Sequence, residues 1–181
     1  MGRPVPHAPV RLVVGMLSAS AEAFGRAEAA MSERFGEVSR ASEPMPFDFT
    51  GYYEAEMGAK LLRKFVAFMR PADPAELAEI KLWTNALEER FAAEPGCAAR
   101  RPINLDPGYV APSKLVLATT KDHAHRVYLG RGIYAEVTLT FHKGAFEPMP
   151  WTYPDYRTEA YRRFFGQVRA DLFARPGTAR P

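Results

Sequence analysis

The segment Lys121–Arg126, with the sequence K-D-H-A-H-R, gathers the side chains in this chain that are best suited to acid–base chemistry. It holds two of the four histidines, His123 and His125, one residue apart. On an extended strand, that spacing places both imidazoles on one face, with the Cα atoms about 7 Å apart. Because a histidine ordinarily titrates near neutrality, each could donate or accept a proton. We therefore take His123 and His125 as candidate catalytic residues.

Carboxylates in and near this segment could act with the histidines either in acid–base catalysis or in metal binding. Asp106 could orient a histidine for proton transfer, and Glu136 is a further candidate catalytic residue. Alternatively, His123, His125 and Asp122 could bind zinc or another divalent metal ion, with Asp106 or Glu136 as other choices of carboxylate. This second signal is weak, because H-x-H stands alone without an H-E-x-x-H motif or a cysteine cluster. The sequence therefore leaves the cofactor unknown.

Basic and aromatic side chains of the same region could bind an anionic ligand. The candidates are Lys121, Arg126, Lys114, Tyr109 and Trp151. Arginine pairs with phosphate or carboxylate through two parallel hydrogen bonds, which favours a phosphorylated or carboxylated small molecule such as a nucleotide. A polar turn that merely carries charged residues explains the same pattern equally well. On the functional reading, the chain is a small enzyme or ligand-binding protein.

The charge distribution permits a nucleic-acid partner without requiring one. The formal net charge is only +3, and residues 102–155 are balanced in sign. The surplus arginines lie towards the C-terminus instead, away from the candidate chemistry. An alternative function is therefore a non-catalytic adaptor that binds protein or RNA through an aromatic and basic surface. Its stacking residues would be Tyr52, Tyr53, Tyr134, Trp151, Tyr153 and Tyr156.

Composition indicates a globular protein with one domain. The chain has 181 residues, of which 47% are hydrophobic and 25% charged. No apolar run reaches the roughly 18 residues of a membrane span, so we expect no membrane association. The single cysteine, Cys97, fits a reducing compartment and a cytoplasmic location. We expect one domain over residues 10–173 with flexible tails at 1–9 and 174–181, while the oligomeric state is not indicated.

The first half of the chain predicts alternating strands and helices. A β-branched strand starts at Val10, and a helix capped by Ser18 or Ser20 ends at Gly36. Further strands are predicted at 38–42, at 60–69 with Pro71 ending it, and at 103–105. A second helix begins at Asp73-Pro74, and its flank Lys81, Thr84, Asn85 and Glu88 is expected to face solvent. This β-α-β-β-α-β order predicts an α+β fold with a ferredoxin-like core.

The second half predicts an extension of that core. Strands at 114–120, 125–129 and 133–143 form an antiparallel meander, and the Gly130-Arg131-Gly132 turn joins the last two. A final helix, capped by Thr158, has an apolar stripe that we expect to pack on the sheet.

Several long phrases resemble a known bacterial family. They are F-D-F-T-G-Y-Y-E-A-E-M-G, A-E-I-K-L-W-T-N-A-L-E, the run from R-P-I-N-L-D-P-G-Y to G-I-Y-A-E-V-T-L, and P-W-T-Y-P-D-Y-R-T. Over roughly residues 10–173 the chain is similar to the family called domain of unknown function 4416. Its members are often labelled GTP-binding proteins, but neither G-x-x-x-x-G-K-[ST] nor G-x-G-x-x-G is present here. The resemblance therefore implies no catalytic residues.

Overall fold

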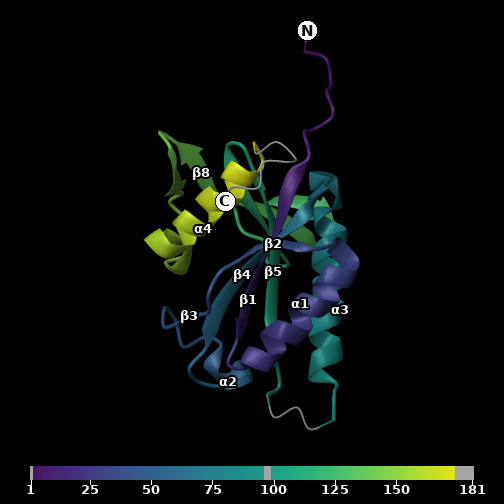
Figure 1. Cartoon of the computed structure of the whole chain (residues 1–181), viewed down its shortest axis with the longest axis vertical. Helices are drawn as coiled ribbons and strands as arrows, with labels where there is room; N and C mark the ends of the chain where they lie inside the picture. The colour runs from purple at the N-terminus through teal and green to yellow at the C-terminus, as the bar shows by residue number, and fades with distance from the viewer. Residues whose placement is uncertain (1, 96–98, 174–181) are drawn as a thin grey trace, which may run out of the picture.

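The structure is a computed structural model that describes residues 2–95 and 99–173. Over these residues it is a mixed α/β protein with one large antiparallel sheet and four α-helices (Figure 1). Residues 2–9 are exposed and form no helix or strand. Cys97 and the predicted tail at 174–181 lie outside the described residues, so the predictions made for them stay predictions. No described helix is long and apolar enough to cross a membrane.

Strand β1 (Val10–Ser18) lies at the centre of the sheet, and its sequence explains why. All of its residues except Arg11 are buried, because both faces of the strand are apolar. It pairs antiparallel with β4 (Leu62–Ala72) on one side and with β5 (Asn104–Ala111) on the other. The full strand order is β2-β4-β1-β5-β6-β8-β7, with β3 added beside β4 and β9 beside β8.

The bounds of the remaining strands are β2 (Val38–Ala41), β3 (Met45–Pro46), β6 (Lys114–Thr119), β7 (Val127–Gly130), β8 (Ile133–His142) and β9 (Ala145–Pro148). Strands β6, β7 and β8 form the predicted meander, whereas β3 and β9 were not predicted. The strand expected at 103–105 is longer, since β5 runs to Ala111. β4 runs through Pro71 to Ala72, and β7 begins at Val127 because the residues before it form a turn.

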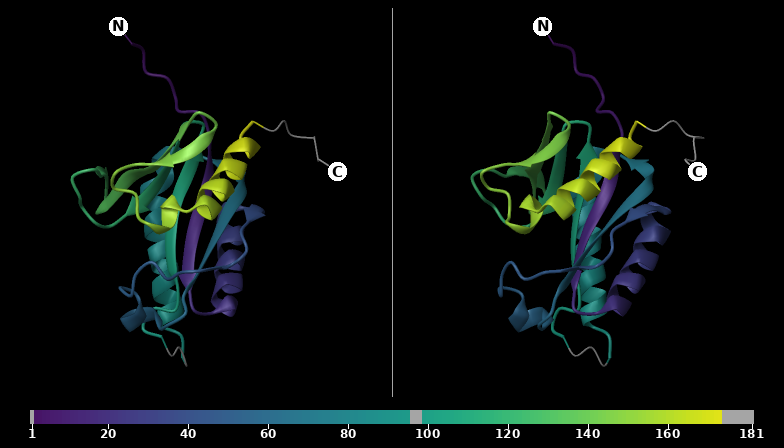
Figure 2. Two further views of the ribbon diagram at one scale, coloured as in Figure 1. Left: turned by 90° about the vertical axis from the view of Figure 1, so that its left-hand side faces the viewer. Right: turned by 60° about the vertical axis from the view of Figure 1, so that its left-hand side comes forward.

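Helices α1 (Ala21–Phe35) and α3 (Leu77–Ala92) lie side by side on one face of the sheet (Figures 1 and 2). The Ser20 side chain caps α1 by accepting a hydrogen bond from the N–H of Ala23 at 3.2 Å. Gly36, at φ 92°, ends the helix in a conformation that a side chain would disfavour. The apolar stripes of both helices pack on Val14, Val66 and other residues of the sheet.

Helix α4 (Glu159–Asp171) packs on the opposite face, as its apolar stripe predicts (Figure 2). Phe164, Phe165 and Val168 cover Phe65 and Val110 there. The 3₁₀ turn η2 (Asp155–Arg157) leads into α4, and η1 (Pro74–Glu76) leads into α3. The short helix α2 (Glu54–Met57) contributes Met57 to a separate small cluster with Leu17, Phe47 and Leu61.

The expected solvated flank of α3 is wrong for three of its four residues. Lys81, Thr84 and Glu88 are buried, and Asn85 is partly exposed. The cause lies in β5, where the backbone of Leu105 lies against this helix. Lys81 Nζ donates to the carbonyl of Leu105 at 2.7 Å, and Glu88 Oε1 accepts from its N–H at 2.7 Å. The flank thus satisfies strand backbone groups that would otherwise be buried without partners.

Candidate functional site

The sheet face that carries α4 also carries a band of polar side chains. Gly108 pairs with Leu117, and Leu117 pairs with Glu136, so these positions share one face. Asp106 lies two residues before Gly108 on β5 and therefore points the same way. Asp106 and Glu136 are thus held on one surface by three adjacent strands. We call this surface the polar face.

The predicted His-x-His segment forms a turn at the edge of the polar face. The N–H of Arg126 donates to the carbonyl of His123 at 2.9 Å, which closes the turn. The imidazoles of His123 and His125 stack in parallel, with centroids 5.8 Å apart and planes 2° apart. The indole of Trp151 continues the stack on the other side of His125, at 5.1 Å and 14°. The two histidines therefore share a face, as predicted, although the backbone is a turn and not a strand.

Glu136 links this turn to the sheet. Its side chain is only 4% exposed, and its Oε2 accepts from Arg126 Nε at 2.8 Å. The same oxygen lies 3.1 Å from His125 Nε2, and the other oxygen accepts from Thr138 Oγ1 at 3.2 Å. The His125 side chain is 24% exposed, so one side of the ring is fixed by a buried carboxylate while part of it reaches solvent. A carboxylate–histidine pair of this kind can orient an imidazole for proton transfer.

Residues from two other segments approach the turn. Lys121 is exposed, and its Nζ lies 5.1 Å from the ring centroid of Tyr52. Tyr52 is 70% exposed and meets the ring of Tyr53 edge to face at 5.1 Å. Tyr153 accepts a hydrogen bond from Arg126 Nη2 at 3.4 Å. The turn therefore carries an ammonium group beside Tyr52 at one end and contacts Tyr153 through Arg126 at the other.

A second polar cluster occupies the part of the polar face next to β1. We call it the arginine network, and its centre is Arg63 of β4, whose side chain is 4% exposed. Nη1 of Arg63 donates to Asp106 Oδ2 at 3.0 Å, and Nη2 lies 3.5 Å from Asp155 Oδ2. Asn104 donates to the same oxygen of Asp106 at 2.6 Å. Asp106 is therefore an ion-pair partner in this network and makes no hydrogen bond to either histidine.

The arginine network continues to the helical side through α3. Arg101 binds Glu88 Oε2 at 2.8 Å through Nη2 and also contacts the side-chain oxygen of Asn104. Lys81 Nζ lies 3.8 Å from Asp106 Oδ1. Each buried carboxylate thus has at least one cationic neighbour, which is what allows charges to persist in this interior.

The network shifts the pKa values of its members in different directions. Burial alone would raise the pKa of Asp106, but Lys81 and Arg63 outweigh burial and hold it below its ordinary value. Burial raises the pKa of Asp155 in spite of the opposing charge of Arg63. Burial, aided by the charge of Asp106, raises the pKa of Tyr53 to about 12. Asp106 is therefore the more firmly ionised of the two acids.

Three buried polar atoms near Arg63 make no hydrogen bond within the described part of the chain: Arg63 Nε, Tyr156 OH and Tyr161 OH. Burial raises the pKa of both tyrosines, which keeps their hydroxyls neutral. A methyl group placed on Gly15 would lie 3.2 Å from Tyr156 OH and 3.3 Å from Arg63 Nη1. The arginine and this hydroxyl are thus packed tightly over the glycine.

Of the other predicted site residues, Tyr109 and Lys114 lie apart from the turn, and Asp122 belongs to the turn but contacts neither histidine in any described interaction. Tyr109 packs with Leu77 and Val116 on the opposite face of the sheet. Lys114 begins β6, at the end of that strand opposite to the histidine turn. Asp122 is exposed and interacts with Tyr134. Over residues 2–95 and 99–173, no group of three or more His, Cys, Asp or Glu side chains is placed to hold a metal ion.

The centre of the arginine network was not among the residues predicted from the sequence. Arg63 nevertheless has a recognisable signal, because it is a charged residue within the otherwise apolar row Leu61, Phe65 and Ala67. A charge in such a row must find a buried partner. Asp155 and Tyr156 carry no comparable signal, because they lie in an irregular connection.

Comparison with known proteins yields one match. The model of the family described as Domain of unknown function (DUF4416) matches residues 8–172. No curated protein and no solved structure matches the chain.

Proposed function

This chain belongs to the DUF4416 family, and we propose that it is a small enzyme or ligand-binding protein for an anionic molecule that contains a phosphate group or a nucleotide. The proposed site is the histidine turn with the adjoining part of the polar face. His125 transfers the proton, Glu136 orients its ring, and Lys121 binds the anion. Trp151 and His123 hold the His125 ring in its stack.

The observation that carries this proposal is the 3.1 Å contact between His125 Nε2 and Glu136 Oε2. It fixes one ring nitrogen against a buried carboxylate and directs the other away from it. A base oriented by a third group is the arrangement that general acid–base catalysis uses. Arg126, expected from the sequence to bind the ligand, is instead engaged with Glu136, so its part is to neutralise that carboxylate.

The anion site rests on charge and exposure. Lys121 makes no ion pair within the described residues, and its ammonium group is exposed beside Tyr52. A phosphate would gain a charge-assisted hydrogen bond from it. The open face of Tyr52 could stack on a planar group of the same ligand. Asp106 acts here at a distance, by holding the arginine network that flanks Tyr53.

The alternative is a non-catalytic adaptor that binds protein or RNA. One observation favours it: the edge strand β7 exposes Val127 (68%), Tyr128 (58%) and Leu129 (42%). An exposed edge strand can pair with an extended peptide through its backbone. This surface continues directly from the histidine turn, so one region could serve either function.

We also propose a ferredoxin-like core and a cytoplasmic location. The strands β2-β4-β1-β5 are adjacent and antiparallel, and the helical connections α1 and α3 cover one face of them. This arrangement supports a ferredoxin-like core. The single cysteine supports a reducing, cytoplasmic environment.

A thermal-shift screen tests the proposed function. Nucleotides, sugar phosphates, inorganic phosphate and divalent metal ions are added singly to the protein, because a ligand that binds only the native state raises its melting temperature. We expect a shift with a nucleotide or phosphate ester that Lys121→Ala reduces and Lys143→Ala, in the β8–β9 turn, does not. If no compound raises the melting temperature, the adaptor is favoured, and pull-down with RNA becomes the next measurement.

A further inference from the structure

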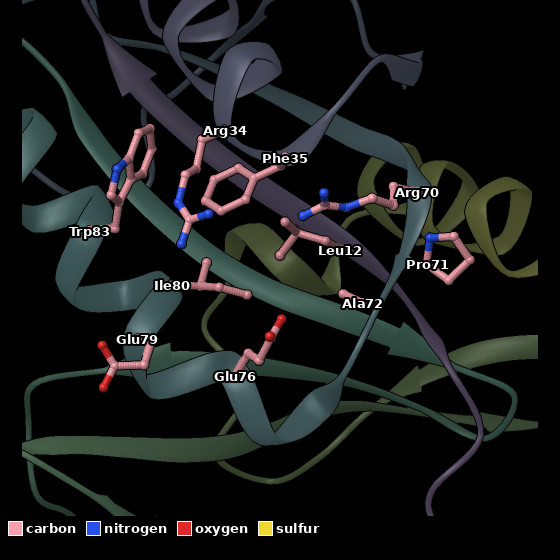
Figure 3. Close-up of a pocket in the computed structure, with 10 residues that line it drawn as sticks. All are labelled: Leu12, Arg34, Phe35, Arg70, Pro71, Ala72, Glu76, Glu79, Ile80 and Trp83. Atoms are coloured by element: carbon pink, nitrogen blue, oxygen red, sulfur yellow. The ribbon is translucent and has the colours of Figure 1, made fainter.

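A cavity of about 230 Å³ lies on the helical side of the sheet, away from the polar face (Figure 3). It opens between the end of α1, the end of β4 and the start of α3. Leu12 and Ile80 belong to the buried core beneath it. Phe35 and Trp83 form an aromatic wall, with ring centroids 5.0 Å apart and planes at 72°. The cavity therefore combines an apolar base with an aromatic side.

Two arginines, Arg34 and Arg70, line the rim of this cavity. Figure 3 shows the two guanidinium groups on either side of the Phe35 ring, Arg34 coming from the last turn of α1 and Arg70 from β4. Among residues 2–95 and 99–173, neither guanidinium has a hydrogen-bond or ion-pair partner. Most other arginines in the described part of the chain do have one, including the exposed Arg163. The rim thus offers two forked donors without an anion.

The carboxylates of the rim do not neutralise these arginines. Glu79 is ion-paired with Arg131 and points away from the space in Figure 3. Glu76 faces the space and forms no ion pair with either arginine in the described part of the chain. Its position in the first turn of the helical segment favours its negative charge there. Because Glu79 is paired with Arg131, the rim has two positive charges, on Arg34 and Arg70, and one negative charge, on Glu76. Its net charge is therefore +1.

We propose that this cavity binds a small aromatic acid. Arg34 and Arg70 hold its carboxylate or phosphate group through paired hydrogen bonds, and the ring packs against Trp83 above the apolar base. Size restricts the ligand, because ligand pockets commonly measure roughly 300–1,000 Å³ and this cavity is smaller. A single ring with one anionic group fits these dimensions, whereas a nucleotide is too large. The cavity shares no residue with the histidine turn, so this site is independent of the proposed function.

Fluorescence of Trp83 provides the direct test. In a Trp151→Phe background, Trp83 is the remaining tryptophan, and its emission reports on the cavity wall. Benzoate and phenyl phosphate are the anionic probes, and benzamide is the uncharged probe of similar shape. We expect a saturable change with at least one anion and none with benzamide. A response to benzoate alone identifies a carboxylate site, and a response to phenyl phosphate alone identifies a phosphate site.

Variants of the rim separate this site from non-specific binding. The double variant Arg34→Ala/Arg70→Ala should weaken binding of the active probe at least about tenfold, and Arg70→Lys should weaken it less. Both side chains are exposed, so the fold tolerates their removal. Arg90→Ala, an exposed arginine of α3 outside the cavity, should leave affinity unchanged. The proposal is overturned if neither anion saturates up to about 10 mM, if benzamide binds equally well, or if the double variant binds like its parent.

Discussion

Arg63 on β4 reaches across the central strand to Asp106 on β5, and the Nη1–Oδ2 distance is 3.0 Å. Gly15 is the residue of β1 that pairs with Asp106, so the guanidinium crosses where a side chain is missing. This contact links two strands that are not paired with each other in the sheet.

Gly15→Ala should destabilise the protein by about 1–3 kcal/mol through overpacking. The added methyl would lie 3.0 Å from Phe65 Cε1 and 3.2 Å from Tyr156 OH, and both rings are buried. Gly25→Ala is the matched control, because nothing lies within 4 Å of that position on the exposed side of α1. It should stabilise the protein by about 0.5–1 kcal/mol. Urea denaturation measures the free energy of unfolding of both variants. Equal changes in the two would contradict the close packing of side chains over Gly15.

Asp106→Asn should make the protein less sensitive to acid. Because the pKa of Asp106 is lowered in the fold, this carboxylate stabilises the protein above its unfolded pKa and loses that contribution as the pH falls towards the folded pKa. Between about pH 5 and pH 2, the free energy of unfolding should therefore fall less steeply in Asp106→Asn than in the parent. Glu43→Gln, at an exposed position, should keep the parental slope. If the free energy of unfolding has the same pH dependence in all three proteins, Lys81 and Arg63 do not lower the pKa of Asp106.

The same substitution should lower the pKa of Tyr53 from about 12 towards its ordinary value. Burial is the larger cause and remains, so we expect a partial decrease. A raised tyrosine pKa stabilises the fold below the unfolded pKa, and that contribution is lost as the pH rises through about 12. Ultraviolet difference titration against Tyr53→Phe isolates this one phenol. An unchanged titration would mean that Asp106 and Tyr53 do not interact.

Glu136 and Arg126 should prove energetically coupled. Removing Glu136 leaves the Arg126 side chain, 3% exposed, without its carboxylate, so Glu136→Gln should cost about 2–3 kcal/mol. A double-mutant cycle with Arg126→Met should give a coupling energy of at least about 1 kcal/mol. The exposed pair Glu159–Arg163 is the control, with about 0.5 kcal/mol or less expected. Equal coupling energies in the two pairs would contradict the inference that the buried ion pair with Arg126 fixes Glu136 beside His125.

His125→Asn and Lys121→Ala should separate chemistry from binding. For the compound with the largest thermal shift, Lys121→Ala should weaken affinity about 5- to 10-fold, which corresponds to one charge-assisted hydrogen bond. His125→Asn should keep affinity within about twofold and abolish turnover of that compound. Calorimetry and product analysis measure the two effects. If His125→Asn retains full turnover, proton transfer by this residue is excluded.

Most helices and strands could be predicted because their signals are local. The apolar stripes of α1 and α4 and the Asp73-Pro74 start before α3 depend on residues within one or two turns. His125 and Glu136 were both candidates from the sequence, but their contact was not predicted, because it depends on how the turn before β7 lies against β8.

The arginine network could not be predicted, because its members are far apart in the chain. Arg63 and Asp106 are separated by 43 residues, and Asp155 joins them from the connection before α4. The helical pattern alone predicts that Lys81 and Glu88 face solvent. Their burial depends on where Leu105 of β5 passes, which is a property of the assembled sheet.

The central position of β1 also affects how the chain folds during synthesis. β1 is synthesised before the strands that pair with it, since Ser18 pairs with Leu62 and Arg11 with Val110. Until β5 has been synthesised, this apolar strand remains without at least one neighbour. Such non-local pairing slows folding and leaves a segment open to association with other chains. Helix α1, whose backbone hydrogen bonds are local, can form early and partly cover β1 during that interval.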